Sequence, residues 1–283
     1  MIRFKNTLTF DPLPDWMMLL KAAISPPSPG CVLARPWKQK DDLFYWFSNS
    51  AWSIVAIVNL WQKLYAKTEP SFWLPGYFCN NSLKPLRSTA ANLVFYPITP
   101  QLEPNYSACR KISKITPPDI FLLKHYFGQP AIASRAAEFC KHEGAWLIED
   151  ADHLTRRSRA VGNHGDFVLY SPHLSLPIPD GALLAVRPNA AGLKRLSEFT
   201  KTVFEQTCDA VVKTVPGKSN LPRTWLAKKI LQKFGIWSLF SQEFDFSEGS
   251  SGKVIPHPQM TDLSRRFLPV VISGLGSVCQ ERR

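Results

Sequence analysis

The chain has 283 residues, which is enough for one large α/β domain or for one domain with an appendage. Hydrophobic residues make up 45% and charged residues 20%, and this balance excludes an intrinsically disordered or fibrous protein. A net charge of +12 favours anionic partners such as nucleic acid, acidic lipid or a phosphorylated ligand, without choosing among them.

The first residues do not form the apolar core of a signal peptide, because acidic residues and prolines interrupt them: Asp11, Pro12, Pro14 and Asp15. The longest apolar run, from Ala51 to Trp61, is shorter than the ~20 residues of a membrane span and contains Asn59. We therefore predict a buried helix here, and no membrane span.

The six cysteines are scattered and include no CxxC pair; they are Cys31, Cys79, Cys109, Cys140, Cys208 and Cys279. This pattern favours reduced thiols in a cytoplasmic protein over a disulfide framework or a zinc site, and we predict no metal site. Cys140 and His142 form a lone C-x-H, which we interpret as the buried and exposed sides of one helix.

Between Phe72 and Val186, short apolar runs alternate with helical stretches, as in a mostly parallel sheet with crossover helices. The predicted strands are Phe72–Leu74, Asn92–Tyr96, Ile120–Lys124, Ala145–Glu149, Asp166–Tyr170 and Ala182–Val186. The clearest β-α-β unit contains the helix ASRAAEFCKHEG, in which Gly144 is placed to end the helix before the next strand.

The pattern changes after Arg187. We predict one long helix from Asn189 to Thr214 and a second, basic and amphipathic, from Arg223 to Leu239. The segments PGKSNLP and SQEFDFSEGSSGKVIPHPQ have the composition of loops. We divide the chain into a large domain, residues 1–215, and a helical and loop region, residues 216–283.

The segment Leu147 to His153 places three carboxylates and a histidine at the end of a predicted strand. Ligands of such sheets gather beyond the carboxyl ends of strands, and a carboxylate there can keep a ring nitrogen protonated. The alternative interpretation is a strand-end turn with solvated acids.

Four blocks, in this order, resemble the DegT/DnrJ/StrS-type sugar aminotransferase family. They are FWLPGYFCNNSLKPLR, KHYFGQP, HEGAWLIEDADH (similar to the family's LIEDAAH) and GDFVLYSPHLSLPIPDGALLAV. The resemblance covers about Trp37 to Val186. It implies fold type I of the enzymes that depend on pyridoxal phosphate (PLP), with PLP as cofactor and nucleotide-linked keto sugars as substrates.

The resemblance also implies site residues. Asp150 matches the family's partner of the pyridinium nitrogen, which makes the ring an electron sink, and His153 matches the residue beside the ring's phenolic oxygen. Asn49, Ser50 and Ala51 match the family's phosphate-binding turn. Ser171 matches the hydroxyl that also binds the phosphate. Tyr77 or Phe78 matches the aromatic residue that stacks on the ring. For Tyr77, Phe78 and Ser171, ordinary core and turn packing is the alternative.

One departure from the family affects the chemistry. Relatives read S-x-x-K-x-L-P-x-P-D-G-G, and this chain has Leu174 at the position of the lysine. That lysine forms the Schiff base with PLP and shuttles a proton, and leucine has no nitrogen for either task. A branch of the family uses histidine for a PLP-dependent dehydration of a sugar, but His173 aligns one residue away, and on a strand-like segment it would point to the other face.

The second departure is length, since relatives continue for roughly another hundred residues into a small domain. We therefore expect an incomplete small domain, with the segment from Thr261 onward as a helix pair without its packing partner. The apolar side chains then left without a surface would be Phe267, Leu268, Val270 and Val271.

Three functions follow as hypotheses. The first is a PLP-dependent aminotransferase-like protein with impaired transamination, or a related sugar dehydratase, that binds PLP non-covalently and takes a nucleotide-linked keto sugar or another small anion. The second is a non-catalytic relative that binds a partner, as a homodimer or as a heterodimer with an active paralogue. The third is a nucleic-acid or membrane-surface protein, suggested by the basic segment from Arg223 to Phe234, although no nucleic-acid motif accompanies it and we expect no nucleic-acid partner.

Overall fold

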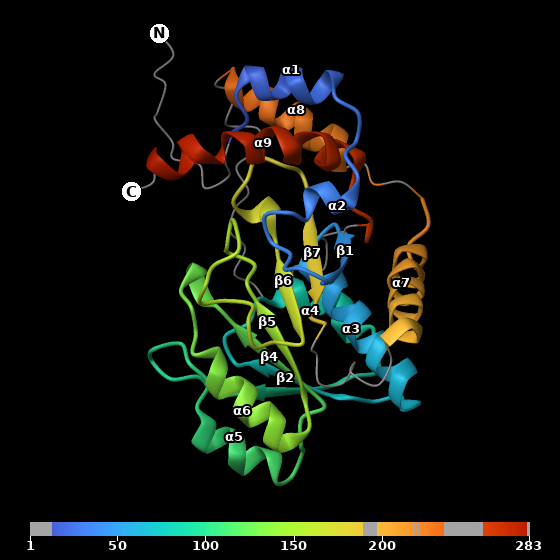
Figure 1. The fold of residues 1–283 in the computed structure, drawn as a ribbon, viewed down its shortest axis with the longest axis vertical. Helices are drawn as coiled ribbons and strands as arrows, with labels where there is room; N and C mark the ends of the chain where they lie inside the picture. The colour runs from blue at the N-terminus through green and yellow to red at the C-terminus, as the bar shows by residue number, and fades with distance from the viewer. Residues whose placement is uncertain (1–12, 189–196, 218, 220, 235–256, 282–283) are drawn as a thin grey trace.

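The computed structural model describes residues 13–188, 197–217, 219, 221–234 and 257–281. Seven strands in these residues form one sheet in the order β1-β7-β6-β5-β4-β2-β3 (Figure 1). The strands are β1 (Leu43–Phe47), β2 (Ser71–Pro75), β3 (Asn92–Tyr96), β4 (Ile120–Lys124), β5 (Trp146–Asp150), β6 (Phe167–Tyr170) and β7 (Ala182–Val186). The helices are α1 (Trp16–Ile24), α2 (Gly30–Leu33), α3 (Ser50–Tyr65), α4 (Asn80–Arg87), α5 (Tyr106–Ser113), α6 (Ala133–Glu143), α7 (Ser197–Lys213), α8 (Leu221–Lys233) and α9 (Asp262–Glu281), with short 3₁₀ turns η1 (Tyr126–Gly128) and η2 (Pro172–Leu174).

The sheet is mostly parallel, as the sequence pattern predicts. The pairs β2–β3, β2–β4, β4–β5 and β5–β6 are parallel, and β7 is antiparallel to both β6 and β1. All six predicted strands are confirmed to within one residue at each end. The prediction omitted β1, because its sequence LFYWF lies two residues before the apolar helix α3 and does not alternate between polar and apolar residues.

Successive side chains of a strand point to opposite faces, and both faces of this sheet are buried. On one face, Phe72, Leu122 and Ile148 pack against α3, α4 and α7. On the other face, Phe121 and its neighbours pack against α5 and α6 over one half of the sheet, and α1, α2 and α9 cover the other half. Burying a Leu, Ile or Phe side chain is worth about 1.5–3 kcal/mol, so this double cover stabilises the sheet.

Helix α3 confirms the predicted buried helix. The Asn49 side chain caps it by accepting a hydrogen bond of 3.4 Å from the backbone N–H of Trp52. The helix ends at Ala66, which is in the left-handed region at φ 51°. At the end of α6, Gly144 takes the same conformation at φ 74°, as predicted.

Helices α1, α8 and α9 gather at one end of the molecule, far from α5 and α6 (Figure 1). The expected helix pair at the C-terminal end is wrong, because α9 is one helix that continues through Pro269. Its apolar side chains are also not left without a surface. Phe267, Leu268 and Val271 are buried in one cluster with residues of α1 and α2, and Trp225 of α8 packs edge-on against the Phe267 ring at 5.6 Å.

The two predicted helices after Arg187 are present where the structure describes them. Helix α7 covers the described part of the first, and residues 189–196 lie outside the described residues. Helix α8 begins two residues before the second prediction, inside the segment PGKSNLP, while residues 235–239 and most of the second predicted loop lie outside. Among the described residues, no helix is both long enough and apolar enough to cross a membrane.

Cysteine burial agrees with reduced thiols. Cys109, Cys140 and Cys208 are buried and free, and Cys31 and Cys79 are exposed and free; Cys279 is a residue whose side chain lies outside the description. Cys140 is buried while the His142 side chain is 82% exposed, which confirms that the two lie on opposite sides of α6.

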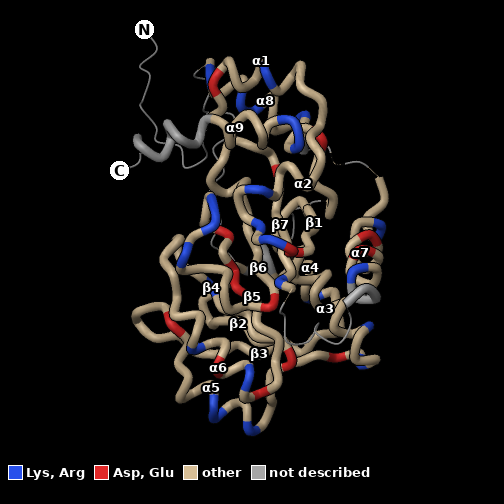
Figure 2. The backbone as a smooth tube through the Cα atoms, in the orientation of Figure 1, with Lys and Arg blue, Asp and Glu red and all other residues tan. Residues whose placement is uncertain are grey.

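Lys and Arg residues lie at both ends of the molecule and along α7 in the view of Figure 2. Among the described residues, those seen in this view are spread over the molecule and are not gathered in a single stripe, the arrangement typical of a nucleic-acid-binding face. Helix α8, the basic helix of the third hypothesis, packs Trp225 against α9 and buries Lys229. Packing within its own fold accounts for its amphipathic pattern.

Two helix ends give a stability test. Ala66→Gly removes the cost of a Cβ in the left-handed region and should raise the free energy of unfolding by about 0.5–1 kcal/mol. Gly144→Ala adds that cost and should lower the free energy of unfolding by about 1 kcal/mol; no atom lies within 4 Å of the added Cβ, so the change is purely conformational. Urea unfolding of both variants measures this, and changes of equal sign would contradict it.

Candidate functional site

Polar residues meet where β4, β5 and β6 end, next to the first turn of α3. Lys124 ends β4, Asp150 ends β5, Ser171 follows β6 and Ser50 opens α3. Parallel strands end at the same edge, and the register pairs Lys124 directly with Asp150. Two residues after Asp150, Asp152 joins this group from the loop that follows β5.

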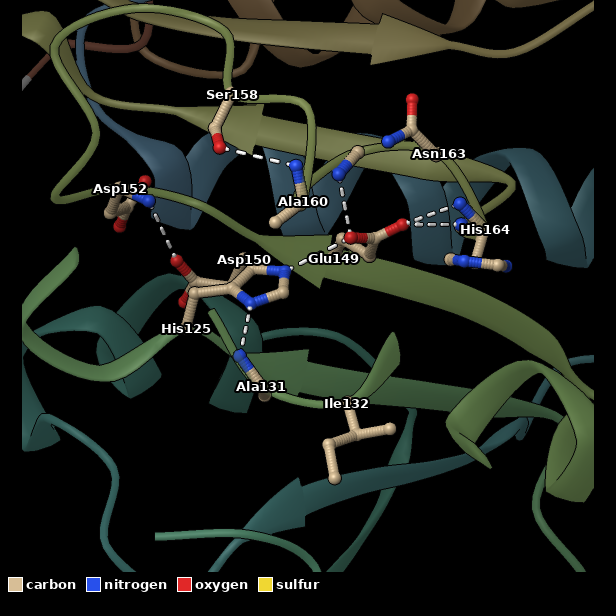
Figure 3. Close-up of polar contacts among 12 residues, drawn as sticks. His125, Ala131, Ile132, Glu149, Asp150, Asp152, Ser158, Ala160, Asn163 and His164 are labelled. Carbon is tan, nitrogen blue, oxygen red and sulfur yellow. Dashed lines mark hydrogen bonds and ion pairs between the residues drawn. The ribbon is translucent and has the colours of Figure 1, made fainter. Parts of the chain in front are cut away.

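Lys124 and Asp150 form an ion pair. The Lys124 Nζ lies 2.7 Å from Asp150 Oδ2, and the Asp150 side chain is almost fully buried. The other oxygen, Asp150 Oδ1, accepts a hydrogen bond of 3.2 Å from the backbone N–H of Asp152 (Figure 3). Both oxygens of the predicted cofactor partner are therefore engaged by groups of the chain itself.

Asp152 holds the two serines that the resemblance assigns to the phosphate. Ser50 Oγ donates a hydrogen bond of 2.7 Å to Asp152 Oδ2, and Ser171 Oγ donates one of 2.6 Å to Asp152 Oδ1. All three side chains are buried. A hydroxyl can donate one hydrogen bond, and each serine donates its hydrogen bond to the Asp152 carboxylate.

The charges in this cluster influence the pKa values of one another. Burial alone would lower the pKa of Lys124, but the carboxylates of Asp150 and Asp152 raise it, so its ammonium stays charged. Burial first, and then the neighbouring Asp152 carboxylate, raise the pKa of Asp150 above its usual range. One ammonium faces two carboxyl groups, and the cluster does not offer an excess of positive charge to an anion.

Glu149 points to the opposite side of β5 from Asp150 and fixes the loop that follows. Its carboxylate accepts backbone hydrogen bonds from Gly162, His164 and Gly165 at 2.6–2.8 Å (Figure 3). The His125 Nε2 lies 3.0 Å away and donates to it, since His125 Nδ1 accepts from the N–H of Ala131. Burial alone would raise the pKa of Glu149, but these hydrogen bonds lower it to about 2.

Gly165 shows how closely the backbone approaches Glu149. A Cβ at Gly165 would lie 2.8 Å from the backbone oxygen of Phe167 and 3.0 Å from Glu149 Cγ. No other residue fits without displacing the backbone. Buried contacts with Glu149 thus hold the end of the loop of residues 151–165. Buried contacts of Asp152 hold its beginning.

A row of rings lies beside the cluster. The Tyr77 ring stacks on Tyr126 at 5.7 Å, Phe127 follows at 6.3 Å from Tyr126, and His153 lies 6.4 Å from Phe127. Tyr77 is 60% and Phe127 66% exposed, and His153 is also exposed. We call these four residues the aromatic row.

Phe78, the other predicted stacking residue, packs partly buried against the core, and Lys124 Nζ lies 5.7 Å from the centre of its ring.

The remaining predicted site residues lie around this edge. Asn49 caps α3, and Ala51 is buried in its first turn. His173 donates from Nδ1 to the backbone oxygen of Gly181 at 2.9 Å, and Leu174, at the lysine position, is 46% exposed in η2. Among the described residues, neither forms a hydrogen bond with Asp150 or Asp152.

Two expectations about this edge change with the structure. The acids after β5 are not solvated, because Glu149, Asp150 and Asp152 are all buried. Lys124 was missed as a site residue, although a lysine at the end of the buried strand IFLLK is a signal of a partner carboxylate. Asp152, which stands where the family block LIEDAAH has alanine, gives the second such signal.

No family model and no curated protein matches this chain. Among solved structures, it is similar to the aminotransferase TlmJ from Streptoalloteichus hindustanus (16% identity, TM-score 0.62, covering 95% of this chain and 66% of that one). It is also similar to the sugar aminotransferase Spr1654 from Streptococcus pneumoniae in its PMP-form (13%, TM-score 0.61, 98% and 70%) and to DesI with its TDP-sugar product (14%, TM-score 0.55, 95% and 61%).

The chain therefore has the fold of the DegT/DnrJ/StrS-type sugar aminotransferases, an α/β fold with a mixed seven-stranded sheet between helices. It spans about two thirds of the length of those structures. At these identities the likeness defines the fold, and the site has to be judged on its own residues.

Judged in this way, the residues do not fit PLP as the resemblance implies. A protonated ring nitrogen would have to displace the Lys124 ammonium from Asp150. A phosphate would have to displace the Asp152 carboxylate from Ser50 and Ser171 and then face its negative charge. Leu174 supplies no amine.

Glu149 gives a pH-dependent test of the loop anchor. Its pKa is lowered in the folded protein, so its stabilisation is complete above its unfolded value of 4.5 and is lost as the pH falls towards 2. Glu149→Gln should lower the free energy of unfolding at pH 7 by about 3 kcal/mol. The difference from the wild type should shrink between pH 4.5 and pH 2.

Chemical unfolding of both proteins across this pH range measures the effect. Glu138→Gln, a change of the same kind on the exposed face of α6, is the control and should stay within about 0.5 kcal/mol of the wild type. A difference for Glu149→Gln that does not depend on pH would contradict the assigned role of its charge.

Proposed function

We propose that this chain is a non-catalytic protein with the sugar-aminotransferase fold, whose own side chains replace the two charged ends of the cofactor. One observation carries this proposal: Lys124 forms an ion pair with Asp150, and Asp152 accepts hydrogen bonds from Ser50 and Ser171. The ammonium supplies the positive charge that a pyridinium would bring. The Asp152 carboxylate accepts the two hydrogen bonds from serine hydroxyls that a phosphate would accept.

The absent lysine supports the same proposal. Amino transfer on PLP needs an amine that forms the Schiff base and a base that moves a proton at the substrate carbon. Leu174 offers neither. His173 is not positioned to replace it, because in the described residues its ring hydrogen-bonds to the Gly181 carbonyl and to neither Asp150 nor Asp152.

The charge balance also bears on substrates. DesI was solved with a TDP-sugar, and a nucleotide-linked keto sugar is the substrate that the resemblance implies. A diphosphate at the Asp150 edge would meet two carboxyl groups and one ammonium. We therefore do not assign a nucleotide sugar to this edge, and we propose that the protein acts by binding a partner.

The aromatic row favours a protein partner. Tyr77, which follows β2, and Phe127, which follows β4, expose more than half of their surface. Aromatic residues are enriched in the centres of protein interfaces. We propose that a second copy of this chain packs against the aromatic row, with an active paralogue as the alternative partner.

Titration with PLP tests the non-catalytic assignment. The wild type should show no saturable PLP binding, and Leu174→Lys alone should give no adduct at residue 174 after borohydride reduction, because the cofactor positions are filled. Adding Lys124→Val and Asp152→Ala to Leu174→Lys empties both positions, and this triple variant should give a reduced adduct at residue 174. Peptide mapping separates that adduct from reaction with surface lysines.

Lys141→Val, on the exposed face of α6, is the control for loss of a lysine and should leave all results unchanged. Stoichiometric PLP binding by the wild type that is weakened by Asp150→Ala would show that the site admits the cofactor. The proposal would then be wrong.

Light scattering after size-exclusion chromatography tests the partner. The wild type should be dimeric at tens of micromolar, and Tyr77→Ser should weaken the dimer by about tenfold or more, the loss typical of an aromatic hot spot. Ile115→Ser removes an apolar side chain that is 86% exposed elsewhere and should leave the dimer intact. A monomeric wild type would contradict a second copy as the partner, and co-purification with the paralogue would then decide for the alternative.

A further inference from the structure

A cavity is formed by α5 and α6, which lie next to each other in Figure 1. Its volume is about 300 Å³. Its wall consists of Tyr106 and Arg110 of α5 and of Arg135, Glu138, Phe139 and His142 of α6. No residue of the Asp150 cluster belongs to this wall, so the cavity has to be explained on its own residues.

Two aromatic rings give the cavity an apolar wall. Phe139 is buried, and its ring centre lies 5.4 Å from that of Phe121 and 6.0 Å from that of Trp73, both in the core. The Tyr106 ring lies 6.0 Å from Phe139 on the side of α5. Because the core holds these rings, they offer a fixed apolar surface to a ligand.

Charges of both signs belong to the same wall. Arg135 and Glu138 are three residues apart on α6, a spacing at which opposite charges can pair, and Arg110 adds a second guanidinium from α5. Among the residues that the structure describes, none of these three side chains forms an ion pair. The Arg135 guanidinium lies instead over the Tyr106 ring, 5.8 Å from its centre. All three charged side chains are exposed and can therefore meet a ligand in the cavity.

Two guanidinium groups and one carboxylate define the ligand class. A guanidinium binds a carboxylate through two parallel hydrogen bonds, whereas the Glu138 carboxylate attracts an ammonium and repels a second anionic group. A free α-amino acid carries one carboxylate and one ammonium on the same carbon atom. The rings of Tyr106 and Phe139 add a preference for an apolar side chain.

The volume agrees with a ligand of this size. About 300 Å³ is at the lower limit of the roughly 300–1,000 Å³ of small-molecule sites. A single amino acid fits this limit better than a nucleotide-linked sugar does.

We propose that this cavity binds a free α-amino acid with an apolar side chain. The carboxylate of the amino acid lies at Arg110 and Arg135, its ammonium at Glu138, and its side chain against Tyr106 and Phe139. This site is additional to the proposed function and does not depend on how the Asp150 cluster is filled. It gives the chain a small-molecule ligand besides its protein partner.

Fluorine NMR of 4-fluoro-L-phenylalanine, without PLP, tests the proposal on the full chain. The amino acid should bind the wild type. Its N-acetyl derivative lacks the ammonium, and its carboxamide lacks the carboxylate. Each derivative should bind at least about fivefold more weakly, because a hydrogen bond to a charged group is lost.

Two variants assign the charges to their partners. Arg110→Met should weaken the amino acid by a similar factor and leave the affinity of the carboxamide unchanged, since the carboxamide has no carboxylate for this guanidinium. Glu138→Gln should weaken the amino acid and leave the affinity of the N-acetyl derivative unchanged. Lys111→Met removes a neighbouring charge of α5 that is not part of the wall and should have no effect.

Absence of binding at millimolar 4-fluoro-L-phenylalanine would overturn the proposal, and so would equal affinities for the three compounds. A variant that weakens the amino acid and the derivative without the matching charge to the same extent would also contradict it, because a charge pair would then not be the cause. If a variant fails to fold, the comparison of the three compounds on the wild type still decides. Because PLP is absent from this experiment, its failure leaves the PLP titration unaffected.

Discussion

The adjacent carboxylates of β5 organise this molecule. Successive side chains of a strand point in opposite directions, so Glu149 and Asp150 serve two sides of the sheet from one place in the chain. Glu149 collects three backbone N–H groups and His125, and thereby fixes the return of the chain into β6. Asp150 and the loop that Glu149 fixes bring Lys124, Asp152, Ser50 and Ser171 together.

In the function that we propose, the Asp150 cluster stabilises this fold without a bound cofactor. Buried carboxylates and hydroxyls are costly unless they have partners. In this chain the partners are side chains of the protein itself. The Lys124 ammonium pairs with Asp150, and the Asp152 carboxylate accepts the hydrogen bonds of the two serines. The same hydrogen bonds and ion pair that stabilise the folded state engage the groups that a ligand would need. In the function that we propose, stability and loss of cofactor binding have one physical origin in this site.

The sequence predicted much of the fold, and the reasons are local. The strands between Phe72 and Val186 are short, β-rich and bounded by turn residues, and Gly144 marks a helix end through its own conformational freedom. Strand β1 was missed because LFYWF has no alternation and borders a buried helix. The packing of α9 was mispredicted because its partners, α1 and α2, come from the other end of the chain, and no local pattern encodes a contact over that distance. In the site, the motif named Asp150, Ser50 and Ser171, which the structure brings together, but not Lys124 or the contacts of Asp152. A match to a family does not reveal which neighbour a substituted side chain will meet.

The contact between α1 and α9 also has a consequence for the order of folding. During synthesis the strands β2 to β6 emerge with their crossover helices and can pair through contacts of short range. Helix α1 and strand β1 precede β2 in the chain, but their partners are α9 and β7, which follow much later. The apolar face of α1 that packs on α9 therefore stays uncovered during synthesis until α9 has emerged.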